Sequence, residues 1–184
     1  MILLLLLVLA APALAGPVED GKAAYDRGDD ASALEIWGAA ADKGDADAQF
    51  WMGVLCDLGR GMAQDHAAAA QWYRRAADQG HVVAQHNLAH MYEAGHGLPA
   101  EYALAAAVTW YTRAANQGYR PSQANLGAMY ATGRGVRRDD VQAYKWFVLA
   151  DSAANRDHVM ARMSRAAIAQ GDGLVAAWKA KPER

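Results

Sequence analysis

The chain has few of the residues that form covalent cross-links or act as nucleophiles. Only one of its 184 residues is a cysteine, Cys56, so no intramolecular disulfide can form and stability must come from packing. Only four serines occur, and none lies in a Gly-x-Ser-x-Gly, phosphate-loop or dinucleotide-binding motif. The sequence therefore predicts no catalytic residue and no cofactor, and we expect a protein that is not an enzyme.

A net basic charge is also missing. The formal net charge is −2, whereas a domain that binds nucleic acid normally carries a basic face, so we expect no nucleic-acid partner. The charge is spread unevenly: residues 16–65 carry −7, residues 66–119 carry 0 and residues 120–184 carry +5. In an elongated array this gradient would steer a charged partner or favour head-to-tail association, or it would simply be solvated surface.

Long runs of β-branched residues are absent, which argues against a sheet. Alanine is abundant, hydrophobic residues make up 53 % of the chain, and alanine, leucine and glutamine favour helix. The composition predicts an almost entirely α-helical protein with ample material for a core.

The first fifteen residues differ from the rest. An unbroken apolar run over residues 2–11 is followed by Pro12 and Ala13-Leu14-Ala15, which predicts a signal peptide over residues 1–15, cut between Ala15 and Gly16. The run is too short for a transmembrane helix, so we expect a periplasmic or secreted protein without stable membrane insertion after cleavage. The alternative is a buried N-terminal helix of the mature fold.

The remainder of the chain is dominated by an internal repeat with successive spacings of 36 and 38 residues. Each unit contains a Gly-x-Gly triplet followed by an aromatic pair. The triplets begin at Gly59, Gly95 and Gly133, and the pairs are Trp72-Tyr73, Trp110-Tyr111 and Trp146-Phe147.

Each unit has the pattern of a helix pair. In the first, Ala48, Met52, Leu55 and Cys56 recur at the spacing of one buried helical face, and the glycine triplet ends the helix. Asp65 then places a negative charge where the dipole of the second helix favours it. In this pattern Cys56 is a small buried hydrophobic residue; the alternative, a reactive thiol, needs an exposed electropositive setting.

These motifs resemble the Sel1-like repeat family, which is related to the tetratricopeptide repeats. Residues 123–136 read QANLGAMYATGRGV and residues 71–80 read QWYRRAADQG, and both match the family pattern. The resemblance implies an all-α fold, a right-handed α-solenoid of antiparallel helix pairs. We expect a signal peptide over 1–15, an N-terminal half-repeat over 16–43, repeats over 44–80, 81–118 and 119–154, and C-terminal capping helices over 155–184.

The resemblance also implies a scaffold that binds another protein, since some exported relatives regulate membrane sensor kinases or serve envelope functions. We expect a monomer that binds one protein partner of unknown identity. The alternative is an enzyme, either a metal-dependent hydrolase or a β-lactam-binding protein like some cysteine-rich members, although those carry paired cysteines in each repeat. A structural envelope protein is a third possibility.

A helical wheel places one row of side chains opposite the buried face of the first helix in each unit. We expect this row to bind the partner, because stacked repeats align equivalent positions and exposed aromatic clusters often form binding hot spots. The alternative is that Ile36 and Trp37 of the half-repeat cover its aromatic end. The predicted row is Phe50, Trp51, Val54, His86, Asn87, His90 and Asn125.

His86 and His90 lie one helical turn apart, which would allow them to share a metal ion. The alternative is two solvated histidines at variable repeat positions. Because no third ligand is defined, the sequence predicts no metal site.

Overall fold

The structure, a computed structural model, describes residues 16–183. The predicted signal peptide of residues 1–15, including Ala15 on one side of the predicted cut, lies outside the described residues. Gly16, on the other side, directly precedes the first helix.

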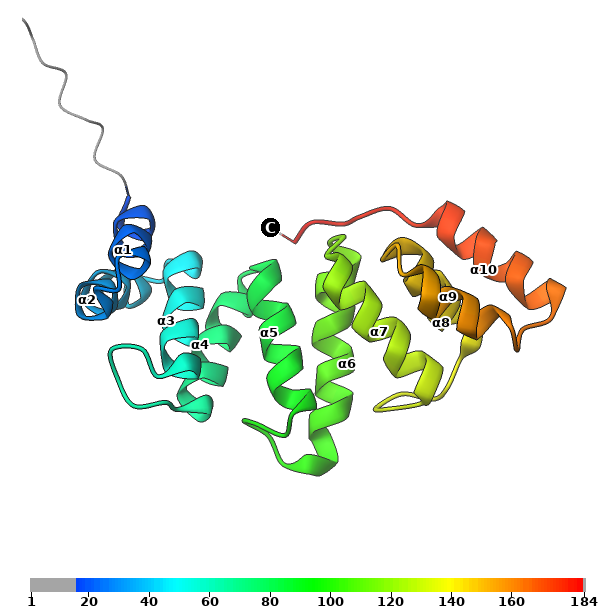
Figure 1. Cartoon of the computed structure of the whole chain (residues 1–184), viewed down its shortest axis with the longest axis horizontal. Helices are drawn as coiled ribbons and strands as arrows, with labels where there is room; N and C mark the ends of the chain where they lie inside the picture. Colours follow the sequence, from blue (N-terminus) through cyan, green and yellow to red (C-terminus); the bar gives the residue numbers. More distant parts are fainter. Residues whose placement is uncertain (1–15, 184) are drawn as a thin grey trace, which may run out of the picture.

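The predicted α-solenoid is confirmed: residues 16–183 form ten helices and no strand, arranged as an elongated, curved array (Figure 1). From α1 to α8 each helix packs against the next, so position in the sequence follows position along the array, and α9 and α10 both pack on α8. The helices are α1 (Pro17–Asp26), α2 (Asp30–Ala41), α3 (Ala46–Leu58), α4 (His66–Asp78), α5 (Val82–Glu93), α6 (Ala100–Asn116), α7 (Arg120–Thr132), α8 (Asp140–Leu149), α9 (Ala153–Met160) and α10 (Arg165–Ala177).

The ends of the helices follow from local sequence. The side chain of Asp65 accepts a hydrogen bond from the Ala68 N–H at the start of α4, and Asp139 caps α8 in the same way. Gly59 and Gly133 end α3 and α7 with φ values of 66° and 76°, a left-handed conformation that glycine adopts without steric cost. The predicted acidic starts and glycine ends of these helices are therefore confirmed.

Close contact between paired helices depends on small residues facing aromatic rings. A Cβ added at Gly53 of α3 would lie 2.6 Å from the Tyr73 ring of α4, and one at Gly127 would lie 2.8 Å from Phe147. Gly38, in contrast, has nothing within 4 Å of the same position. The paired helices can therefore approach closely at Gly53 and Gly127 only because these positions have no side chain.

The two extra residues of the second unit lengthen a helix, not a loop. Helix α6 has 17 residues and α4 has 13, whereas the loop before α6 is shorter than the loop before α4. The insertion therefore falls just after a loop, in the first turns of α6.

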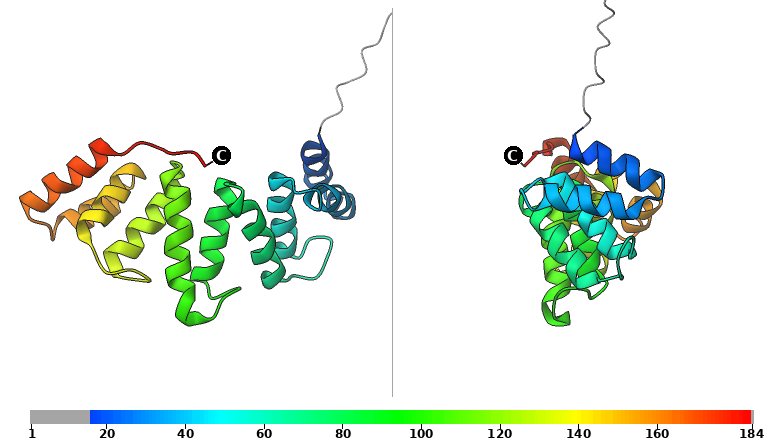
Figure 2. Two further views of the ribbon diagram at one scale, coloured as in Figure 1. Left: turned by 180° about the vertical axis from the view of Figure 1, so that it is seen from behind. Right: turned by 90° about the vertical axis from the view of Figure 1, so that its left-hand side faces the viewer.

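The last described residues turn back along the array. After α10, residues 178–183 are not helical and run past α7 and α6 toward α5, as both long views show (Figures 1 and 2). The backbone N–H of Lys181 donates a 2.7 Å hydrogen bond to the carbonyl of Asn116 at the end of α6. Sequence order therefore stops following spatial order in this segment, which we call the tail.

No helix within residues 16–183 combines the length and apolar character that a membrane span requires.

Candidate functional site

The predicted partner-binding row lies on α3, α5 and α7, the first helices of the three repeats. Phe50, Trp51 and Val54 are on α3, and Asn125 is on α7. His86, Asn87 and His90 are on α5, and His90 is the only exposed member of the row; the other six are half-buried.

The aromatic end of the row is partly covered by the N-terminal helices. The Trp51 ring stacks on Trp37 of α2, with centroids 4.8 Å apart and planes within 7°, and lies 5.6 Å from the Tyr25 ring of α1. Trp37 itself is fully buried. The predicted alternative therefore describes Trp51 well, with Tyr25 taking the place that the sequence assigned to Ile36.

Phe50 points toward the next repeat. Its ring stacks on the imidazole of His81 at 4.7 Å and lies 6.0 Å from the Tyr73 ring. The Nδ1 atom of His81 also accepts a hydrogen bond from the Ala84 N–H and so caps α5. Trp51 thus packs against the N-terminal helices that precede α3, whereas Phe50 packs against the start of the following repeat.

The polar members of the row also contact aromatic residues. The Nδ1 atom of His86 lies 2.9 Å from Ser122 Oγ, and its ring packs against Tyr111 and Tyr119. Burial lowers the pKa of His86 to about 4, so the imidazole is neutral at physiological pH. The Tyr111 hydroxyl, beside Asn125, donates a 2.9 Å hydrogen bond to Glu93, and burial, followed by the charge of Glu93, raises its pKa.

The histidines do not form a metal site with other ligands. Within residues 16–183, no group of three or more histidine, cysteine, aspartate or glutamate side chains is placed to hold a metal ion. His86 is engaged by Ser122 while His90 is exposed.

Cys56 is buried, as predicted. Its Sγ lies 3.4 Å from the sulfur of Met62. Burial, followed by the negative charges of Asp65 and Asp57, raises the pKa of the thiol. These conditions disfavour the thiolate that a nucleophile requires.

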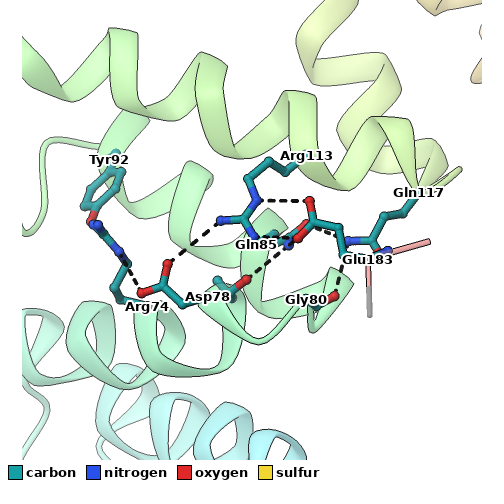
Figure 3. Close-up of polar contacts among 9 residues, drawn as sticks. Arg74, Asp78, Gly80, Gln85, Tyr92, Arg113, Gln117 and Glu183 are labelled. Carbon is teal, nitrogen blue, oxygen red and sulfur yellow. Dashed lines mark hydrogen bonds and ion pairs between the residues drawn. The ribbon is translucent and has the colours of Figure 1, made fainter. Parts of the chain in front are cut away.

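A second polar site, which the sequence did not predict, lies where the tail meets the array (Figure 3). The Glu183 carboxylate accepts hydrogen bonds from Arg113 through both Nε, at 3.0 Å, and Nη2. It also accepts a 2.8 Å hydrogen bond from Nε2 of Gln85, a fully buried side chain. Arg113, and then Gln85, hold the pKa of Glu183 below its ordinary value. The Arg113–Glu183 ion pair is bidentate and charge-assisted, which makes it a strong contact.

The array itself orients the groups that hold Glu183. Nε2 of Gln117, at the end of α6, donates to the side-chain oxygen Oε1 of Gln85 at 2.8 Å and to the backbone carbonyl of Gly80 at 3.2 Å. Nε2 of Gln85 also donates to the backbone carbonyl of Ala77. The Arg113 guanidinium lies 4.4 Å from the centre of the Trp110 ring. We call Gln85, Arg113 and Gln117 the Gly80 acceptor, because they receive the carboxylate of the tail beside the Gly80 turn, although the hydrogen bonds to that carboxylate are donated by Gln85 and Arg113.

Repetition in the sequence contains the signal for this site. Glutamine recurs at the same place in the first helices, as Gln49, Gln85 and Gln123, and Arg75-x-x-x-Gln79 recurs as Arg113-x-x-x-Gln117. What the sequence could not give is the ligand, because Glu183 is separated from Arg113 by 70 positions.

Comparison with known proteins places these features in context. A family model described as Sel1 repeat matches residues 46–81, 82–119 and 120–150, which together make up more than half of the chain. No curated protein is significantly similar to the chain.

Two solved structures share the fold. A Sel1 repeat protein from Oxalobacter formigenes is 28 % identical with a TM-score of 0.66, over 79 % of this chain and 57 % of that one. The protein c5321, described as a protective antigen of uropathogenic Escherichia coli with an SLR fold, is 27 % identical with a TM-score of 0.57, over 78 % of this chain and 40 % of that one. The chain thus matches about half the length of these structures.

Proposed function

Because the chain belongs to the Sel1 repeat family, whose members typically act as scaffolds for protein–protein interaction, we propose that it is an exported adaptor that binds a protein partner. The partner-binding surface is the face formed by the first helices α3, α5 and α7. The proposal assigns the protein no catalytic role and no cofactor.

One observation carries this assignment. His90 of α5 and Ala128 of α7 occupy equivalent positions and are both exposed, and half-buried Val54 occupies the same position on α3. Half-buried ring and amide side chains flank them, including His86 and Asn125. The row thus combines exposed positions with partly covered aromatic and hydrogen-bonding side chains. A partner protein could pack against such a row without any rearrangement of the solenoid core.

Export is supported by the apolar segment of residues 2–11 and its Ala-x-Ala ending. The description of c5321 as a protective antigen also fits an exported protein. The predicted cleavage is tested by fractionating cells and determining the N-terminus of the processed chain. Gly16 is expected as the first residue in the extracytoplasmic fraction, and an uncut chain in the cytoplasm would contradict export.

The binding surface is tested by site-specific photocrosslinking in the native compartment. A crosslinker at His90 or at Ala128 should capture the same partner, whereas one at Ala105, an exposed position on α6, should not. Ala128→Arg should abolish capture from position 90, while the matched control Ala105→Arg should leave it unchanged. Equal capture from positions 90 and 105, or no effect of Ala128→Arg, would contradict the proposed surface.

A further inference from the structure

The tail passes two successive turns between repeats, with the two contacts three residues apart. Ala180 lies at the Gly118 turn between α6 and α7, where its Cβ is 3.6 Å from a Cβ built on that glycine. Glu183 lies at the Gly80 turn between α4 and α5, with the corresponding distance 3.1 Å. The segment therefore advances three residues per repeat, and an extended chain covers about 10 Å in three residues.

The next turn in the same direction, at Gly44, is built in the same way. Gln79 donates to Gln49 Oε1 at 2.8 Å, as Gln117 does to Gln85. Gln49 donates to the Ala41 carbonyl, as Gln85 does to the Ala77 carbonyl. We call Gln49, Arg75 and Gln79 the Gly44 acceptor.

The arginines of the two acceptors stack on equivalent tryptophans, although Arg113 also lies 3.8 Å from the Asp78 carboxylate. Arg75 lies 4.4 Å from the centre of the Trp72 ring, the same distance at which Arg113 lies from the Trp110 ring. Stacking on the indole fixes the plane of each guanidinium and leaves its N–H groups available to a carboxylate. The fork that holds Glu183 is therefore present twice.

The two acceptors differ in occupancy. No carboxylate within residues 16–183 forms an ion pair with Arg75, whose side chain is exposed, as is that of Gln79. An open cavity of about 460 Å³ adjoins the Gly44 turn, and its charged lining residues are Lys43 and Asp45.

The third repeat does not continue the row. Three residues after its aromatic Trp146 comes Leu149, where the first two repeats have Arg75 and Arg113, and α8 ends there. The array therefore offers two acceptors, one filled by its own tail and one open.

We propose that the Gly80 and Gly44 acceptors together bind an extended acidic segment of a protein partner, with two carboxylates three residues apart. Glu183 occupies the Gly80 acceptor in the isolated chain and competes with that segment. The surface is the edge formed by the turns between repeats and is distinct from the first-helix face, so each proposal can fail without the other.

The test is a fluorescence-anisotropy titration with a labelled peptide. The probe is Ala-Lys-Pro-Glu-Ala-Ala-Glu, which continues the sequence of residues 180–183 to a second carboxylate, and the control peptides replace the second or both glutamates by glutamine. The protein is the full chain, as wild type and as Glu183→Gln, which keeps the tail but removes its carboxylate. Arg75→Gln is added to the second protein, with Arg137→Gln as a matched control at an exposed arginine in the loop before α8.

The two-glutamate peptide is expected to bind Glu183→Gln about tenfold more tightly than wild type, because each carboxylate–arginine contact is charge-assisted. Arg75→Gln should weaken this binding about tenfold, Arg137→Gln should not, and the peptide without its second glutamate should not respond to Arg75→Gln. Equal binding of the peptide with no glutamate, or no effect of Arg75→Gln, would refute the proposal. Sedimentation that shows wild-type dimers lost in Glu183→Gln would assign the acceptor to the tail of a second copy and would also refute it.

Discussion

The contact between Trp51 and the N-terminal helices predicts a local loss of stability on substitution. Trp51 stacks on Trp37 and contacts Tyr25, and it is half-buried. Replacing a fully buried tryptophan by alanine costs about 3–5 kcal/mol, and each aromatic pair accounts for about 0.5–1.5 kcal/mol beyond burial. Because part of the Trp51 ring already faces solvent, we expect Trp51→Ala to lower the free energy of unfolding by about 2 kcal/mol, roughly half the fully buried cost.

The loss should be concentrated at one end of the array. In a repeat protein each unit contacts only its neighbours, so a weakened contact between α2 and α3 should release α1 and α2 before the central repeats. Amide hydrogen exchange should show faster exchange in residues 17–41 of Trp51→Ala, with little change in α5 to α7. Urea unfolding followed by circular dichroism should show an early loss of helix.

Two variants make this test discriminating. Trp51→Phe keeps a ring against Trp37 and should recover part of the stability, while His90→Ala alters an exposed residue of the same row and should leave unfolding unchanged. If Trp51→Ala exchanges and unfolds like wild type, the stack contributes nothing to the N-terminal helices. Trp51 would then be available to a partner, as the sequence alone suggested.

The packing and the pKa shifts support three further predictions. Gly38→Ala should raise the free energy of unfolding by about 0.5–1 kcal/mol, because alanine favours helix over glycine. Gly53→Ala should lower it by about 1 kcal/mol, because the clash with the Tyr73 ring outweighs that gain. Thermal unfolding measures both, and a stabilised Gly53→Ala would contradict the close contact. Since Arg113 lowers the pKa of Glu183, docking of the tail should persist above the ordinary carboxylate pKa and weaken as the pH falls through the lowered pKa. Protection of the tail amides from hydrogen exchange should show this pH dependence in wild type but not in Glu183→Gln. Burial lowers the pKa of His86 to about 4, so below about pH 6.5 the imidazole is protonated in the unfolded chain but still neutral in the folded chain. The free energy of unfolding should therefore fall as the pH is lowered from about 6.5 to about 4. Urea unfolding at pH 7 and pH 5 should show this fall in wild type and a smaller one in His86→Gln.

Much of the fold could be predicted because its signals are local. The acidic cap at Asp65, the glycine end at Gly59 and the buried spacing of Ala48 and Leu55 each depend on residues within one or two helical turns. The same signals recur in each repeat, so the pattern of one unit predicts the architecture of the whole solenoid.

The candidate sites were harder to predict because their partners are distant in sequence. A helical wheel places Trp51 away from the buried spacing of α3, but it carries no information about Trp37 in the preceding unit, on which Trp51 stacks. The contact between Glu183 and Arg113 requires knowing that the tail turns back after α10, and no local pattern in residues 178–183 specifies that path.

The buried glutamines mark where the array can be lengthened. Gln49 and Gln85 each receive a hydrogen bond from a glutamine at the end of the following second helix. Oε1 of Gln123 is buried and has no hydrogen-bond partner among residues 16–183, because α8 stops at Leu149 before the equivalent position is reached. For protein engineering, this means that Gln123 can still accept a hydrogen bond from an added repeat. A second helix with the sequence pattern of α6, followed by its glutamine, would donate that hydrogen bond to Oε1 of Gln123. New units are therefore best grafted at α8, and the two-acceptor edge would then extend by one more site for each unit added.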